Sequence, residues 1–341
     1  MKTLQEQPEA PQATKTPQTT RVSVSVALSQ WWMVIILLAL IIVFALFAPG
    51  FLSQENFVST TVFASSTLLL AVAETFVIIT AGIDLSVGAI LGLSGMVSAV
   101  AMQYMTTAHY GATPTIIVGL IVAMLTGTVI GAINGLVIAF MDITPFIATL
   151  GMLGIATGFT FLITNGVEIT NIPLSIGNIG NASLLGWLPI PFGIAIIVGL
   201  IAHYALKSTR FGLQTYAIGS NAEGSRVSGV NVKRHLFYIY TLSGLISGLA
   251  GFLVVSRLIA GSPLEGANDE LNAIAAVVIG GASLFGGTGT IFRTFVGGLV
   301  ISVLVTGLVI AGVQPYWQTV AVGVTIILAV FIDQRQQKQE K

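Results

Sequence analysis

Three acidic residues lie within or beside long apolar runs of this chain, where a charge is costly: Glu74, Asp84 and Asp142. An ionised acid at the centre of a membrane helix costs about 2.5 to 3.5 kcal/mol. Asp142 falls in a short polar turn, so its cost is small. Glu74 lies inside its run, where such a group typically faces a bundle interior or a polar path. Glu74 is therefore the first candidate for chemistry.

Asp84 follows Gly82, a residue that interrupts the apolar run. Asp84 or Ser86 can cap the next helix by accepting hydrogen bonds from its free amides, and this is the simpler interpretation. A proton relay would need a partner, and no second acid or histidine is expected at the depth of Glu74. The three histidines are scattered and cysteine is absent, so the sequence predicts no metal site, no thiol chemistry and no cofactor.

The segment Gly280–Gly289 is rich in glycine and suggests a phosphate-binding loop. It lacks the Gly-Lys-Ser/Thr ending of such loops, and no soluble strand precedes it. We therefore expect a tight re-entry turn that uses the backbone freedom of glycine.

The composition predicts an all-α integral membrane protein. Of 341 residues, 55% are hydrophobic and 8% are charged, against about 25% charged in soluble proteins. A span needs about 20 apolar residues. About ten spans are predicted, of which the eighth is short: 31–48, 57–80, 86–105, 115–140, 144–165, 191–206, 236–256, 272–285, 291–312 and 316–332.

The placement of the cations predicts the orientation of these spans. With both termini in the cytoplasm, every cation except Arg257 falls inside, in agreement with the positive-inside rule. The inside set is Lys2, Lys15, Arg21, Lys207, Arg210, Arg226, Lys233, Arg234, Arg293, Arg335, Lys338 and Lys341. We expect a disordered tail over residues 1–28, a transmembrane domain over 29–333 and a cytoplasmic tail over 334–341. The first span is expected to be retained rather than cleaved as a signal peptide.

Glycines recur in several predicted spans at a spacing that brings helices close together. They are Gly88 and Gly92; Gly127, Gly131 and Gly135; Gly154 and Gly158; and Gly244 and Gly248. Ordinary packing inside one subunit is the simpler prediction for each set, and a dimer contact is the alternative.

The longest polar interruption, residues 207–235, holds five of the thirteen cations. Within it, Ser220 and Glu223 fit a capping box, and Gly229 fits a helix stop. The predicted helix of about two turns is too short to be stable alone, so other spans or a partner must hold it. This favours a docking site for a cytosolic partner over a solvated loop whose cations only fix the topology.

Five segments together resemble the permease subunits of ribose-type sugar ABC importers. They are Ala81–Gly88; Asn134-Gly135; Pro145–Gly151; Ala217–Glu223; and Val278–Gly281 with Ser283–Gly287. The resemblance implies the type II importer permease fold in a bacterial inner membrane. It also implies a cytosolic ATP-binding subunit, a periplasmic or lipid-anchored sugar-binding protein and a second permease copy. The residues expected to couple to the ATPase are Gly219, Ser220, Asn221, Glu223, Arg226 and Gly229.

Three positions depart from the family pattern. Gly224-Ser225 stands where two alanines are usual, Thr157 where arginine is common and Arg293 where glycine is usual. Glycine at 224 is expected to loosen the short helix by about 1 kcal/mol relative to alanine.

We therefore expect a subunit that is not an enzyme and that moves a small neutral sugar, ribose or another monosaccharide, while a separate subunit hydrolyses ATP. No nucleic-acid partner is expected. The residues expected along the path are Glu74, Thr75, Asp84, Asn134, Thr149 and Asn165. Two alternatives stay open: a proton-coupled secondary transporter that uses Glu74 or Asp84, and the amino-acid branch of the same superfamily. A homodimer and a pair with a sister permease are both compatible with the sequence.

Overall fold

The computed structural model describes residues 24–339 except residue 185, with side chains for residues 32–331 except 185. The chain divides into residues 1–32, of which the described part is helical, and residues 33–341. The fold below is that of the second unit. The expected disordered tail lies mostly outside the described residues, although helix α1 already begins at Val24.

Helices make up nearly all of the regular structure. They are α1 (Val24–Phe47), α2 (Gln54–Ile79), α3 (Val87–Thr107), α4 (Ala112–Phe140), α5 (Pro145–Thr164), the 3-10 helix η1 (Leu174–Ile176), α6 (Gly177–Gly180), α7 (Ile190–Ser208), α8 (Arg210–Ser220), α9 (Ala222–Val227), α10 (Val232–Leu258), α11 (Asp269–Ile279), α12 (Ile291–Ile310) and α13 (Pro315–Gln339). Two short strands, β1 (Ser183–Leu184) and β2 (Leu188–Pro189), form an antiparallel pair.

Among the described residues, seven helices are long and apolar enough to cross a membrane: α2, α3, α4, α5, α7, α10 and α12. Each lies within four residues of its predicted bounds. Two shorter apolar stretches, Trp32–Phe47 and Pro315–Phe331, belong to α1 and α13. The predicted span at 272–285 is wrong, because α11 ends at Ile279 and glycine turns follow it.

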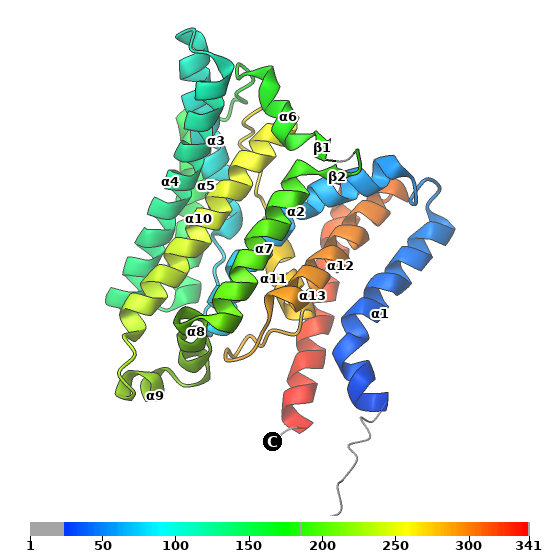
Figure 1. Ribbon diagram of the computed structural model, residues 1–341, viewed down its shortest axis with the longest axis vertical. Helices are drawn as coiled ribbons and strands as arrows, with labels where there is room; N and C mark the ends of the chain where they lie inside the picture. Colours follow the sequence, from blue (N-terminus) through cyan, green and yellow to red (C-terminus); the bar gives the residue numbers. More distant parts are fainter. Residues whose placement is uncertain (1–23, 185, 340–341) are drawn as a thin grey trace, which may run out of the picture. The chain divides into compact units, whose positions relative to one another are not determined.

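The core of the bundle lies around α2 and α10, whose apolar stretches are mostly buried. Figure 1 shows α10 lying along α4, and glycines permit this contact. A Cβ atom on Gly127 would overlap the carbonyl oxygen of Gly244 and lie 2.8 Å from the Cα of Gly248. The predicted close packing through these glycines is confirmed.

Helix α5 behaves differently, because most of its apolar surface is uncovered. Apart from the backbone of α5 itself, no atom of the described residues lies within 4 Å of a Cβ built on Gly151, Gly154 or Gly158. The prediction that Gly154 and Gly158 pack inside the subunit is therefore wrong. They belong to an uncovered strip on α5.

Two non-helical segments, one between α2 and α3 and one before α11, bring polar groups into the bundle. After α2 ends, the chain reverses through Ala81, which has a φ of +62°, and α3 begins only at Val87. Before α11, a loop packs against the start of α3, where a Cβ on Gly88 would lie 3.1 Å from the amide nitrogen of Glu270. Gly88 and Gly92 therefore do allow a close approach, but to a loop and a helix start.

Candidate functional site

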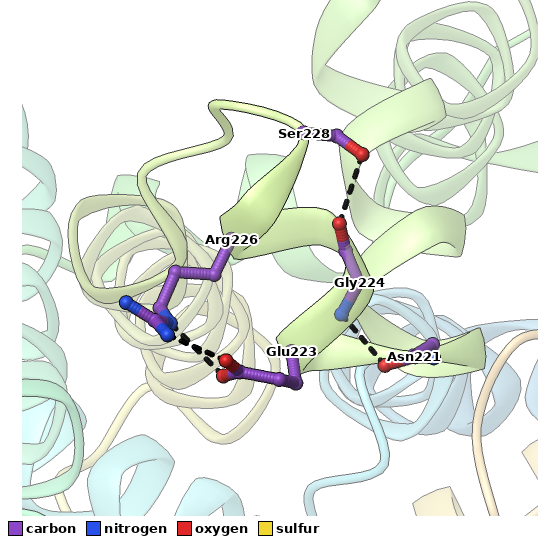
Figure 2. Close-up of polar contacts among 5 residues, drawn as sticks. All are labelled: Asn221, Glu223, Gly224, Arg226 and Ser228. Carbon is purple, nitrogen blue, oxygen red and sulfur yellow. Dashed lines mark hydrogen bonds and ion pairs between the residues drawn. The ribbon is translucent and has the colours of Figure 1, made fainter.

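The polar segment at 207–235 forms two short helices, α8 and α9, between α7 and α10 (Figure 1). The N-cap of α9 is Asn221, whose Oδ1 accepts a hydrogen bond from the Gly224 amide at 2.8 Å (Figure 2). Ser220 ends α8 instead, and its hydroxyl donates to the Tyr216 carbonyl. The N-cap is therefore displaced by one residue from the predicted Ser220, because asparagine is as good an N-cap as serine and the chain turns at Asn221.

Glu223 does not reach back to the helix start, as a capping box would require. Its carboxylate accepts a hydrogen bond from Arg226 Nε at 2.9 Å within the same helix (Figure 2). This bond holds the pKa of Glu223 below its ordinary value. Both side chains are about two-thirds exposed, so the pair contributes little to folding and leaves its charge at the surface.

The structure shows how α9 ends and where Ser225, one of the two residues that depart from the family pattern in this helix, is placed. Gly229 has a φ of +88°, which agrees with the predicted glycine stop. Ser225 is buried and its hydroxyl donates to the Asn221 carbonyl. The Ser228 hydroxyl donates to the Gly224 carbonyl (Figure 2). Each of these carbonyls also accepts the amide of the same serine, so the two hydroxyls find acceptors within the helix itself.

Three backbone segments meet at what we call the glycine junction: α8 at Gly219, the end of α2 at Ile79, and the loop residues Gly286 and Gly287. The Gly287 amide donates to the Ile79 carbonyl at 2.9 Å. A Cβ atom on Gly219 would overlap that carbonyl and lie 2.6 Å from the Gly287 nitrogen. The glycine-rich segment is thus a tight turn, as predicted, and it is pressed against α8.

Side chains reinforce this attachment of α8 to the bundle. The Tyr216 hydroxyl donates to the Gly289 carbonyl at 2.7 Å. Thr215 Oγ1 and His235 Nε2 lie 2.9 Å apart, and the His235 ring packs 4.6 Å from that of Phe211. Helix α8 is therefore in contact with α2, with the start of α10 and with the glycine-rich loop.

The acidic residues of the spans form a buried cluster. The Asp84 amide donates to Glu74 Oε1 at 3.0 Å, and Asp84 Oδ1 accepts from the Ser86 hydroxyl at 2.6 Å and the Ser86 amide at 3.0 Å. The expectation that no second acid lies near Glu74 is wrong, because the chain reversal after Gly82 returns Asp84 to the level of Glu74. The expected capping is seen only in part: Ser86 is the N-cap residue of α3 but makes no side-chain cap bond, and the Asp84 carboxylate accepts from the Ser86 amide just before the helix.

Two other helices close this cluster. Ser243 of α10 donates to Asp84 Oδ2 at 3.2 Å, and Asn134 of α4 donates to the Ser86 hydroxyl at 2.8 Å. Glu74 and Asp84 are 0% exposed and Asn134 is 1% exposed. The cluster therefore joins α2, α3, α4 and α10 in the closed interior of the subunit.

The other expected path residues are dispersed. Thr75 is buried between α2 and α12, where its hydroxyl lies 2.8 Å from that of Thr294. Thr149 donates to the Ile83 carbonyl at 3.1 Å, beside the buried cluster. Asn165 is exposed at the end of α5 in the left-handed region. The role of these residues in a path stays a prediction.

A cavity that the sequence does not predict lies beside the start of α11. This α11 cavity has a volume of about 240 Å³ and lies between α3, α5 and the loop before α11. Its lining includes Glu270, Asn268, Thr157 and Thr160. Only the acidic pair Asp269-Glu270 at a helix start could have drawn attention to it.

Burial raises the pKa of Glu270 to about 7 from an ordinary value of 4.5. The folded chain then binds more protons than the unfolded chain between these values, so its stability falls as pH rises through this window. We expect Glu270→Gln to raise the midpoint of thermal unfolding in detergent at pH 8 and to change it little at pH 4.5. An equal shift at both pH values would contradict this assignment.

Comparison with known proteins identifies relatives along most of the chain. The family described as branched-chain amino acid transport system / permease component matches residues 56–330. The ribose import permease protein RbsC of Escherichia coli strain K12 is 39% identical over 311 residues, covering 89% of this chain and 93% of the relative.

Two further relatives also match most of the chain. The D-allose transport system permease protein AlsC of the same strain is 39% identical over 299 residues, covering 87% of this chain and 89% of its own. The fructose import permease protein FrcC of Rhizobium meliloti is 40% identical over 277 residues, covering 78% of this chain and 74% of the relative. No solved structure matches the chain. Since seven helices of the described residues are long and apolar enough to cross a membrane, this chain is a multi-pass membrane protein that belongs to the permease-component family of these transport systems.

Proposed function

We propose that this chain is the membrane-spanning subunit of an ATP-driven importer that carries a small neutral sugar into a bacterial cell. The observation that carries the proposal is the close backbone packing of α8, which leads directly into the short helix α9, against the bundle at the glycine junction. A soluble motor that moves this pair would move α2 and the glycine-rich loop with it. The names of the relatives support a sugar as the cargo.

The same geometry supports an orientation and two partners. Lys207, Arg210, Arg226, Lys233 and Arg234 surround α8 and α9, which favours the cytoplasmic side for this end of the bundle. The partner here is the ATP-binding subunit. A sugar-binding protein delivers the cargo at the opposite end, where Arg257 and Glu265 lie 3.8 Å apart.

The proton-coupled alternative receives less support from the buried cluster. Glu74 and Asp84 lie in the closed interior, and three of the bonds to the Asp84 carboxylate fix the start of α3 and its contact with α10. A structural role accounts for these bonds without proton transfer.

Uptake by the complete complex tests the function. We expect liposomes that contain this chain, its ATPase and its binding protein to accumulate at least one of ribose, allose and fructose only when ATP is supplied on the ATPase side. Dissipating the proton gradient should have no effect. Uptake that needs a proton gradient and no ATP would support the secondary transporter, and uptake of leucine alone would support the amino-acid branch.

A second copy of the chain is the partner we propose for the uncovered strip on α5. Gly151, Gly154 and Gly158 recur on one helical face with open space above each. In lipid, small residues let helix backbones approach closely enough to gain dispersion contacts. Two copies of α5 facing each other across a two-fold axis would cover this strip.

Cross-linking tests this homodimer directly, because the chain contains no cysteine. We expect Gly154→Cys, as the single cysteine, to give a covalent dimer in native membranes when a short thiol cross-linker is added. The matched control is Leu200→Cys on α7, which is 64% exposed but lies on another helix. A dimer at Leu200→Cys and none at Gly154→Cys would refute the α5 contact.

A further inference from the structure

The α11 cavity contains a buried carboxylate that the coupling mechanism does not use. Glu270 is 9% exposed and lines a space of about 240 Å³. In the described part of the chain, its carboxylate belongs to none of the ion pairs, and no other side chain donates a hydrogen bond to it. A buried carboxylate without a side-chain partner is costly to keep, which points to an occupant that supplies donors.

The rest of the lining determines what that occupant can be. Thr160 donates its hydroxyl proton to the Ala156 carbonyl, so its oxygen is left to accept. Thr157 and the Asn268 amide can both donate and accept. Phe161, Leu153 and Pro263 supply an apolar surface. Pockets of this kind, mostly apolar with a few placed polar groups, bind small organic ligands.

The charges favour a neutral ligand with several hydroxyl groups. Glu265, which also lines the cavity, lies 3.8 Å from Arg257. No cation of the described residues lines the cavity, so an anion has no partner there. A polyhydroxylated ligand can donate to Glu270 and both donate to and accept from Thr157 and Asn268.

We infer that the α11 cavity is a transient sugar-binding site inside the permease, in which Glu270 accepts hydrogen bonds from sugar hydroxyls. This inference rests on the proposed function and deepens it. The cavity is bounded by α5, next to the strip assigned to the dimer contact, and by α11, which leads into the glycine-rich loop against α8. A sugar bound here would contact elements that move with the coupling helices.

Thiol protection tests occupancy without depending on transport. Thr157→Cys, as the single cysteine in the reconstituted complex, should react with a water-soluble thiol reagent, and saturating ribose should slow that reaction at least about threefold. The matched control is Thr170→Cys in an exposed loop, where ribose should have no effect. Adding Glu270→Ala to Thr157→Cys should remove the protection. Labelling of Thr157→Cys that is the same with and without ribose, allose or fructose would overturn the inference.

Transport kinetics separate binding from structure. Loss of hydrogen bonds to a charged acceptor should raise the KM for uptake about tenfold to a hundredfold in Glu270→Ala. ATP hydrolysis stimulated by the binding protein should stay within about twofold of wild type, as it should in the exposed control Glu168→Gln. Unchanged uptake in Glu270→Ala, or equal loss of uptake and stimulated hydrolysis in both Glu270→Ala and Glu270→Gln, would overturn the site. A wild-type complex that carries no sugar would instead refute the proposed function.

Discussion

Alanine at Gly219 should abolish ATP-driven uptake while the chain still inserts into the membrane. The added methyl group would overlap the Ile79 carbonyl and lie 2.6 Å from the Gly287 nitrogen. Both neighbours are backbone atoms joined by a hydrogen bond of 2.9 Å, so neither can rotate away as a side chain could. Overpacking of this kind typically costs about 1 to 3 kcal/mol, and here it also separates α8 from α2.

Uptake and ATPase retention in the reconstituted complex measure this effect. The matched control is Gly323→Ala in α13, another helical glycine, where no described residue outside its own helix backbone lies within 4 Å of the new methyl group. That variant should be neutral or slightly stabilised, because alanine is favoured in helices by about 1 kcal/mol. Normal uptake by Gly219→Ala would show that the glycine junction has no part in coupling.

Removal of the Asp84 carboxylate should give the largest loss of stability among single changes in the buried cluster. Asp84→Ala would leave the Ser86 hydroxyl and amide and the Ser243 hydroxyl without the acceptor they now share. Each unsatisfied buried group costs about 1 to 3 kcal/mol, so a loss of about 3 kcal/mol or more is expected. The start of α3 and its contact with α10 should loosen together.

Thermal unfolding in detergent and the yield of folded chain measure this loss. Asp142→Ala serves as the control, because Asp142 is exposed and its ion pair with Lys233 contributes little. A fully stable Asp84→Ala chain that has lost only proton-driven uptake would instead favour the secondary transporter. The two results separate a structural carboxylate from a proton carrier.

The helical framework could be predicted because apolar length is a local property of the sequence. The seven long spans agree with the structure, whereas the segment at 272–285 does not. A glycine such as Gly280 or Gly281 can continue an apolar helix or form a turn, and here both lie in the turn that ends α11. Composition alone does not distinguish the two possibilities. Gly229 was located correctly because a glycine stop depends only on local backbone geometry.

Features that depend on tertiary contacts could not be predicted. The pairing of Asp84 with Glu74 requires the reversal of the chain after Gly82. The α11 cavity requires α5 to lie beside a loop more than a hundred residues away in sequence. The choice of Asn221 over Ser220 as N-cap was a one-residue ambiguity between two equally good caps.

Retention of the ATPase by the purified chain tests coupling through α8 and α9 most directly. We expect the wild-type chain, solubilised from native membranes under mild conditions, to retain its ATP-binding subunit in a fixed ratio. Glu223→Arg should lose it, because the change reverses an exposed charge at the start of α9 and places it beside Arg226. Gly323→Ala should retain it. A wild-type chain without any ATPase, or a Glu223→Arg chain that retains it fully, would contradict docking at α9.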